Sequence, residues 1–499
     1  MASRMNGRLA YQVVLTMLAL VMGCDGGGRF VSVGEGMDRE LPGVDPLDGA
    51  TSDGELDGAD SDGSADMDGA MTDGSSLDDL ELPDGSIILG DGAIQLPDGE
   101  IIDEETAEMR FGSEVDVSTC EITELDSITV PVSFGDEGGF ALAPSAASGF
   151  ALAVNATTMG DCSSNVGVGL LPSQGALPSP EPMLPDCKVT RDVAMLGVPG
   201  AFHVAWVDNV TDTAELHRVM LDRDLKPMGA FERITITSSA AELEVKPVLA
   251  RVSERPLLAW IARTSEPKQA GIMGKFLDGT DTETYELLGA DEGYDPQGIA
   301  VTRIGVEKLG MVGWVGPQAN PGVWVLRLDE AGHAEGGPIK LTERVGASSS
   351  IDLAPRIDGG GAVYSIVIDS LPQVRFRRFD QEGNTRGDER ALISPPQRAQ
   401  DASLATLGGG YAVAYRALPS DGQTGAEIRL MFISKEGNVT RDDQGRAVTF
   451  PIGESSLATG RTQVEVSLDG VLMVGWLDAA SDGSGNVLKV ARRSLTCAI

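Results

Sequence analysis

A short apolar strand pattern that returns seven times is the feature that most constrains how this chain of 499 residues can fold. Each copy is a run of five residues that ends in a position here called the anchor. The anchors are separated by 52, 54, 54, 52, 49 and 61 residues. The copies are Phe150–Val154, Phe202–Trp206, Pro256–Trp260, Gly310–Trp314, Ala362–Ile366, Tyr411–Tyr415 and Leu472–Trp476. A strand repeat with a period near 50 residues predicts a ring of equivalent small sheets, the β-propeller.

Each repeat contains more than its anchor strand. A short apolar strand precedes it, as in Pro247–Ala250, and an alternating strand follows it, as in Val323–Leu328. The following strand runs into a turn with Gly in its last place, which fits a hairpin loop with glycine in the left-handed conformation. These turns are Asp329–Gly332, Asp380–Gly383 and Ser434–Gly437. One more strand is expected after each turn, so the sequence predicts an all-β fold with seven blades of four antiparallel strands.

The residue before each anchor is always small. These residues are Ala153, Ala205, Ala259, Gly313, Ser365, Ala414 and Gly475. A blade is covered on both faces by its neighbours, so its inner strands should be apolar throughout. A small side chain would let the next sheet approach closely, whereas a sheet that faced solvent would carry charges at this position.

The first 24 residues resemble a bacterial export signal with a lipid-attachment site. Two arginines precede an apolar stretch, Leu9–Met22, which is short for a membrane span of about 20 apolar residues. It ends in Leu20-Val-Met-Gly-Cys24, which resembles the lipobox of bacterial lipoproteins. The resemblance implies cleavage before Cys24, acylation of that residue and durable anchoring by several acyl chains. An ordinary secretory signal with an incidental cysteine is the alternative.

Four cysteines remain after the signal, and an even number fits an oxidising compartment. They are Cys120, Cys162, Cys187 and Cys497. Of the three possible pairings, the favoured one joins Cys162 to Cys187 and Cys120 to Cys497. Because Cys120 precedes the first repeat and Cys497 follows the last, their bridge would lock the seam of the ring. Such a closure is worth about 4–5 kcal/mol in the chain-entropy model.

Residues 25–105 are acidic and of low complexity, with 24 Asp or Glu against two Arg. Low hydrophobicity with charge of one sign cannot offset the entropy of ordering. We therefore predict a signal peptide over 1–23, a disordered linker over 24–105 and a propeller domain over 106–499. A seven-residue repeat of Asp-Gly and β-prone residues, from Pro83 to Asp103, could form short strands. Calcium binding in the linker is the alternative, but the sequence has no complete calcium-loop motif.

The charge of the chain limits its partners. The formal net charge is −38, of which −16 falls on residues 120–499. Such a chain is repelled by nucleic acid and by anionic lipid headgroups, so we expect no nucleic acid partner. The 38 Lys and Arg residues are scattered along the sequence and predict no basic patch.

The sequence singles out no catalytic, metal-binding or cofactor-binding residue. The three histidines, His203, His217 and His333, form no zinc-binding pattern. There is no Gly-x-Ser-x-Gly elbow, phosphate loop or dinucleotide fingerprint. Acidic residues are too numerous to reveal the paired carboxylates of a glycoside hydrolase. We therefore expect no cofactor.

Four tryptophans occupy anchor positions, where blade packing explains them better than a role as sugar platforms. They are Trp206, Trp260, Trp314 and Trp476. Trp324 is off register, on an outer strand, and is the one aromatic residue with a possible surface role.

Residues 120–499 resemble the propeller domains of bacterial envelope proteins in architecture. We predict a monomeric, lipid-anchored protein on the periplasmic or cell-surface side of a membrane, which binds a protein or glycan and is not an enzyme. The alternative is an extracytoplasmic glycan hydrolase or lyase with acidic residues at the central channel. Buried Asp or Glu with an Arg at the channel mouth would favour the enzyme, and a small or apolar lining would favour the binding protein.

Overall fold

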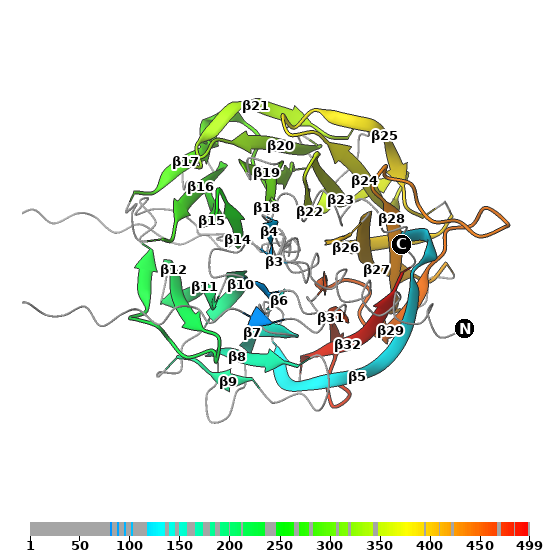
Figure 1. Cartoon of the computed structure of the whole chain (residues 1–499), viewed down its shortest axis with the longest axis horizontal. Coiled ribbons are helices and arrows are strands. Elements are labelled where there is room, and N and C mark those ends of the chain that lie inside the picture. Colours follow the sequence, from blue (N-terminus) through cyan, green and yellow to red (C-terminus); the bar gives the residue numbers. More distant parts are fainter. Residues whose placement is uncertain are drawn as a thin grey trace, which may run out of the picture.

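The computed structural model arranges the chain as a closed ring of seven blades around a common axis (Figure 1). It describes residues 117–134, 139–144, 149–156, 165–172, 180–184, 190–198, 200–210, 213–234, 246–263, 269–278, 283–305, 309–317, 321–342, 348–393, 396–408, 410–420, 424–466, 471–483 and 485–497, with four two-residue strands between 80 and 102. Each blade is one sheet of four antiparallel strands. The seven-bladed propeller that the repeat predicts is confirmed.

In blades 1 to 6, the strands follow one another in sequence from the common axis to the rim (Figure 1). Blade 1 contains β6 Phe140–Pro144, β7 Phe150–Ala156, β8 Asn165–Leu171 and β9 Glu181–Pro182. Blade 2 contains β10 Thr190–Val198, β11 Ala201–Val210, β12 Thr213–Asp222 and β13 Glu232–Ile234. Blade 3 contains β14 Pro247–Val252, β15 Arg255–Arg263, β16 Ala270–Phe276 and β17 Tyr285–Leu288.

Blade 4 contains β18 Gly298–Ile304, β19 Leu309–Val315, β20 Val323–Leu328 and β21 Ala334–Lys340. Blade 5 contains β22 Ser348–Arg356, β23 Gly359–Ile368, β24 Leu371–Phe379 and β25 Thr385–Ala391. Blade 6 contains β26 Arg398–Leu407, β27 Gly410–Leu418, β28 Ala426–Ser434 and β29 Phe450–Ser455. Blade 7 contains β30 Thr462–Val466, β31 Val471–Ala479 and β32 Asn486–Thr496, and its fourth strand is β5 Glu121–Phe134.

The repeated anchor strand is the second strand of every blade, and the core lies between the blades rather than within them. Seven apolar clusters of described residues each span one blade-to-blade seam. A Cβ atom added at Gly313 would lie 2.7 Å from the Cδ1 atom of Ile351 in blade 5. One added at Gly475 would lie 2.7 Å from the ring of Phe140 in blade 1. Close approach of the next sheet therefore explains the small residue before these anchors.

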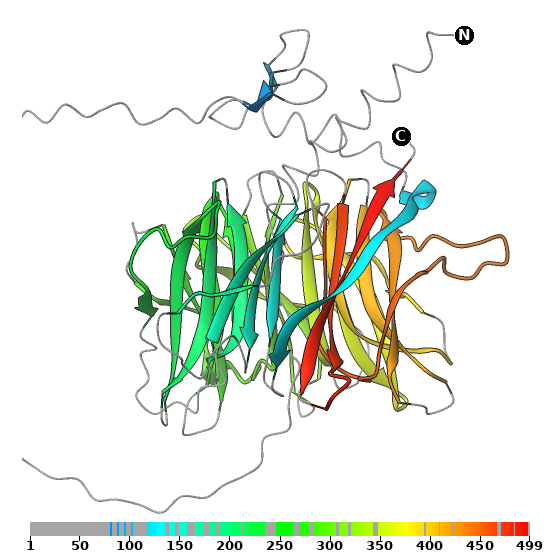
Figure 2. The same cartoon turned by 90° about the horizontal axis from the view of Figure 1, so that it is seen from below.

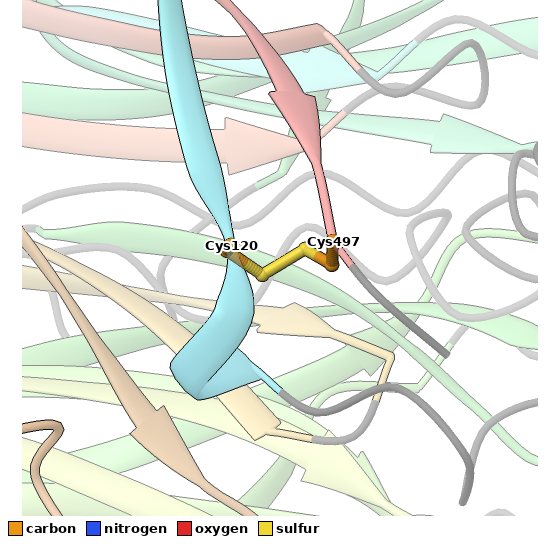
Figure 3. Close-up of a disulfide and its surroundings, with 2 residues drawn as sticks. All are labelled: Cys120 and Cys497. Atoms are coloured by element: carbon orange, nitrogen blue, oxygen red, sulfur yellow. A yellow bond between two sulfur atoms is a disulfide. The ribbon is translucent and has the colours of Figure 1, made fainter.

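Blade 7 closes the ring by taking its outermost strand from the N-terminal end of the domain. β5 pairs with β32 along its length, and the guanidinium of Arg492 in β32 donates to the carboxylate of Asp126 in β5. Cys120 and Cys497 form a disulfide across a sequence separation of 377 residues (Figure 3). The predicted pairing of Cys120 with Cys497 is confirmed.

The predicted hairpin turns have the expected backbone. Gly332, Gly383 and Gly437 have φ angles of 79°, 84° and 84°, which a residue with a side chain rarely adopts. Each glycine N–H donates to the carbonyl of the first turn residue, as in the 3.0 Å bond from Gly383 to Asp380. These turns hold the third and fourth strands of a blade at a fixed register.

The predicted signal peptide, Cys24 and most of the acidic linker lie outside the described residues. The seven-residue repeat contains short strands, as it predicts, since β2 Ile87–Ile88, β3 Ile94–Gln95 and β4 Ile101–Ile102 form a small sheet with β1 Leu80–Glu81. In the part of the chain that the structure describes, none of the helices has the length and apolar character needed to cross a membrane.

Candidate functional site

The innermost strands of the blades differ in polarity at one repeated position. In each blade, one residue of the innermost strand pairs with the small residue that precedes the anchor. In blades 1 to 4 this residue is apolar, and in blades 5 to 7 it is polar. In blade order the residues are Ala141, Ala194, Val248, Ala300, Ser350, Ser403 and Gln463. Two residues further along their strands, blades 5 and 7 also place the acids Asp352 and Glu465.

Asp352 joins blade 5 to blade 6. Its Oδ2 atom accepts hydrogen bonds from the Ser403 hydroxyl and from the backbone N–H of Leu404, both at 2.9 Å. Its Oδ1 atom accepts from the backbone N–H of Leu353 at 3.0 Å. Burial raises the pKa of Asp352 to about 8, against the lowering effect of these donors. The carboxyl group therefore accepts hydrogen bonds from two groups on the innermost strand of blade 6.

The same arrangement continues around the ring. The backbone N–H of Val464 in blade 7 donates to the Ser403 hydroxyl at 3.2 Å. The Gln463 amide then makes two bonds to the backbone of Leu142 in blade 1, at 2.8 and 3.0 Å, and donates to Glu465 at 2.7 Å. An innermost strand has no neighbour on the side of the common axis, so its backbone groups need other partners. Asp352, Ser403 and Gln463 supply such partners. These three residues and Glu465, which accepts from Gln463, are called the polar wall below.

A buried arginine of β27 holds the segment that joins blade 6 to blade 7. Arg416 is fully buried and donates to three backbone carbonyls, those of Leu457, Gly460 and Leu477, at 2.7 to 3.0 Å. Asp401 lies 4.0 Å from it and accepts from the backbone N–H of Gly460. Burial raises the pKa of Asp401 to about 6. These contacts hold the loop that joins the two blades.

Buried polar residues of the innermost strands are not confined to the polar wall of blades 5 to 7. Blade 4 also buries Thr302 and Arg303 in β18. Asp352 and Gln463 use their side-chain atoms to join neighbouring blades. These hydrogen bonds connect blade 5 to blade 6 and blade 7 to blade 1.

A groove of about 990 Å³ lies at the rim of blade 6. One wall is the segment that leads from blade 5 into β26. A second consists of the C-terminal end of β27 and the N-terminal end of β28, and a third is a long hairpin between β28 and β29. This hairpin projects from the ring (Figure 2). Ligand sites commonly have volumes of about 300–1,000 Å³. The groove is large enough for an extended ligand.

Four arginines line this groove, which is named the arginine groove below. They are Arg398, Arg429, Arg441 and Arg446. Two of them are paired with acids of the groove, because Arg429 contacts Glu427 at 2.7 Å and Arg446 contacts Asp442 at 2.8 Å.

The other two arginines have no carboxylate partner among the described residues. Arg441 is exposed and donates only to the backbone carbonyl of Gly445, at 2.8 Å. The buried Nε atom of Arg398 has no hydrogen-bond partner. Two uncompensated cations thus face one groove in a chain of net charge −38. The expectation that no basic patch exists is wrong, because folding brings together arginines that are up to 48 positions apart.

Two sequence signals point to this groove. The spacing of 61 residues between the last two anchors is the longest of the six and reports an insertion. The inserted segment carries a further Asp-x-x-Gly turn, Asp442–Gly445, with Gly445 at a φ of 75°. Asp442 accepts from the backbone N–H groups of Gln444 and Arg446, which lowers its pKa. The repeat pattern alone could not show which side chains the inserted hairpin would face.

The histidines and Trp324, which the sequence analysis considered, either pack against neighbouring residues or are exposed. His203 is buried, and burial together with Arg218 lowers its pKa to about 4. His217 stacks on Trp206 with ring centroids 5.6 Å apart, and His333 is exposed. Trp324 is half-buried and packs edge-on against Tyr294. Cys162 and Cys187 lie outside the described residues, and within the described part no cluster of three or more His, Cys, Asp or Glu could hold a metal ion.

Comparison with known proteins gives weak structural similarities only. No protein-family model and no curated protein matches the chain. A GH43 endo-arabinanase from Bacillus licheniformis is similar at 12% identity and a TM-score of 0.30, covering 51% of this chain and 95% of its own. An α-L-arabinanase of Penicillium chrysogenum is similar at 11% identity and a TM-score of 0.39, covering 61% of this chain and 92% of its own. The hemagglutinin-neuraminidase ectodomain of parainfluenza virus 5 is similar at 11% identity and a TM-score of 0.38, covering 77% of this chain and 88% of its own. At these values the similarities carry no argument about what this chain binds or cleaves.

Proposed function

We propose that this protein is a binding module of the cell envelope that captures a polycarboxylate partner in the arginine groove of blade 6. The observation that carries the proposal is the pair Arg398 and Arg441, which line one groove without carboxylate partners in an acidic protein. The planar guanidinium group matches a carboxylate with two parallel hydrogen bonds. The remaining surface charge is mostly negative, so the groove is the favourable place for an anion to bind.

Isothermal titration calorimetry with polyglutamate and with polygalacturonate tests this proposal and separates an acidic polypeptide from an acidic glycan. Each charge-assisted hydrogen bond contributes about 1.5–3 kcal/mol, so R398Q/R441Q should weaken binding roughly 100-fold. The control variant R386Q/R390Q removes the same charge from exposed positions of β25 outside the groove. It should change the dissociation constant less than about threefold, because exposed charges are screened by salt. Equal losses in the two variants would contradict a specific groove.

The same proposal includes attachment to a membrane through Cys24. The lipobox-like residues Leu20–Cys24 support it. Metabolic labelling with palmitate should mark the full chain and should disappear in Cys24→Ser. Label that persists in this variant would contradict the anchor.

A glycan hydrolase is the second candidate function, and the observation that favours it is the acid pair Asp352 and Glu465 in the innermost strands of blades 5 and 7. A carboxyl group with a pKa of about 8 is protonated at neutral pH and could act as a general acid. Release of reducing sugar from arabinan that is lost in D352N and retained in R398Q/R441Q would support this candidate. Release that is unchanged in D352N would exclude Asp352 as its acid.

A further inference from the structure

We propose that the arginine groove selects an acidic polypeptide that carries an aliphatic side chain between its carboxylates, rather than an acidic glycan. The inference rests on the proposed function, because it requires that Arg398 and Arg441 bind carboxylates. It adds the class of partner and the apolar residues that would recognise it.

Part of the groove surface is continuous with the apolar core between blades 5 and 6. Ile393 and Tyr415 line the groove and are buried members of that core cluster. Ala417 and Ala447 also line the groove, are half-buried and pack against the same cluster. Val448, the next residue of the hairpin, is a half-buried lining residue as well. The groove therefore keeps aliphatic surface that a ligand can contact.

Strand pairing places charged residues beside this aliphatic surface. Tyr415 pairs with Arg429 and Ala417 pairs with Glu427 across β27 and β28, so these four side chains share one face of blade 6. Arg429 contacts Glu427 at 2.7 Å and donates to the hydroxyl of Thr449 at 2.6 Å. The groove thus holds this arginine with its own residues, and a ligand has to use other cations.

The two arginines without carboxylate partners among the described residues stand on different walls, each next to an aliphatic residue of the groove. Arg398 is the first residue of β26, and the residue after it, Ala399, pairs with Ala417. Arg441 lies in the hairpin and forms a β-bridge with Ala447. A ligand whose carboxylates reach both cations therefore brings the groups between those carboxylates to aliphatic surface.

An aliphatic side chain fits this surface better than a sugar does. Removing aliphatic groups from water is favourable, whereas a hydroxyl that loses water without gaining a hydrogen-bond partner costs free energy. The carboxylates of Glu427 and Asp442 already accept from Arg429 and Arg446, which leaves fewer acceptors for the hydroxyl donors of a glycan. Among the described residues that line the groove, Tyr415 is the only aromatic one, and at 1% exposure it offers no ring face for a sugar.

Isothermal titration calorimetry with two peptides of equal charge tests the inference. The peptides are acetyl-Glu-Glu-Leu-Glu-Glu-amide and the same peptide with Ser in place of Leu. We expect the wild-type protein to bind the Leu peptide about tenfold more tightly, because the leucine side chain leaves water on binding. Val448→Thr should reduce this preference to about threefold, because a hydroxyl replaces a methyl group against the ligand.

Val439→Thr is the matched control. Val439 is also half-buried in the segment between β28 and β29, but it does not line the groove. This variant should keep the preference for the Leu peptide. A preference that falls equally in both variants would assign it to the fold of the hairpin and would overturn the inference.

The other outcomes separate this inference from the proposed function. Equal affinity for the two peptides, or a preference that Val448→Thr leaves unchanged, would overturn the aliphatic contact. The proposed function stands in that case if R398Q/R441Q weakens the binding of both peptides, and both proposals fall if R398Q/R441Q changes neither affinity. Polygalacturonate that binds more tightly than the Leu peptide, and is lost in R398Q/R441Q, would overturn the polypeptide partner and leave the groove as a carboxylate site.

Discussion

The polar wall of the innermost strands and the arginine groove of blade 6 both gather polar side chains, but they differ in how those side chains are satisfied. In the polar wall, Asp352 accepts three hydrogen bonds and Gln463 bonds both backbone groups of Leu142. In the groove, Arg441 has one backbone acceptor and the Nε atom of Arg398 has none. The wall is saturated by its own fold, whereas the groove keeps donors for another molecule.

This difference separates stability from function. A buried polar group costs free energy unless it is paired, so a saturated network holds elements together. An arginine without a carboxylate partner lacks this stabilising contact, and we propose that it serves a ligand instead. We therefore expect changes in the ring and its polar wall to alter folding stability, and changes in the groove to alter binding.

The largest effect on stability should come from the ring closure. Removing the disulfide with C120S/C497S releases a constraint on a loop of several hundred residues, which is worth about 5 kcal/mol in the chain-entropy model. Urea unfolding should show this loss, while polyglutamate affinity measured on the folded protein should stay unchanged. A loss of affinity at full folding would mean that the groove depends on the closure.

A smaller loss should follow from breaking the polar wall. Ser403→Ala removes one donor to Asp352 and one acceptor for the backbone N–H of Val464. An unsatisfied buried group costs about 1–3 kcal/mol, so the unfolding free energy should fall by that amount. Ser420→Ala is the matched control, because it makes the same substitution at the rim of the groove and outside the polar wall. It should lower the unfolding free energy by less than about 0.5 kcal/mol.

The effect that is smallest per measured step should appear in the pH dependence of stability, because it is spread over about four pH units. The pKa of Asp352 is about 8 in the folded state, above its ordinary value near 3.8, so the folded protein binds the extra proton. Its contribution is fully present below pH 3.8 and is lost as pH rises through 8, at up to about 1.4 kcal/mol per pH unit. Asp352→Asn should make the urea midpoint of unfolding depend less on pH over this range. A wild-type urea midpoint that does not fall relative to that of Asp352→Asn between pH 5 and 8 would contradict the burial of this carboxyl.

The sequence predicts the ring well because its information is local and repeated. Anchors such as Trp314, small neighbours such as Gly313 and turn glycines such as Gly383 recur at fixed offsets, and each reports a packing constraint of one blade. The disulfide of Cys120 and Cys497 followed from their positions at the two ends of the array.

The sites could not be predicted in the same way because they break the repeat. Arg398 and Arg441 line one groove because an inserted hairpin between β28 and β29 supplies one of its walls, and nothing in their local sequence marks them. Asp352 and Ser403 come from different blades, and their contact depends on how neighbouring strands are staggered. The unusual spacing of 61 residues marked the place of the insertion, but not the side chains that it assembles.

A crystal structure of the protein with a short oligoglutamate tests the central claim most directly, because it shows where a carboxylate binds. The account predicts a carboxylate in the groove within hydrogen-bonding distance of Arg398 and Arg441, with the polar wall unchanged. A carboxylate bound beside Asp352 and Glu465, with an empty groove, would contradict it.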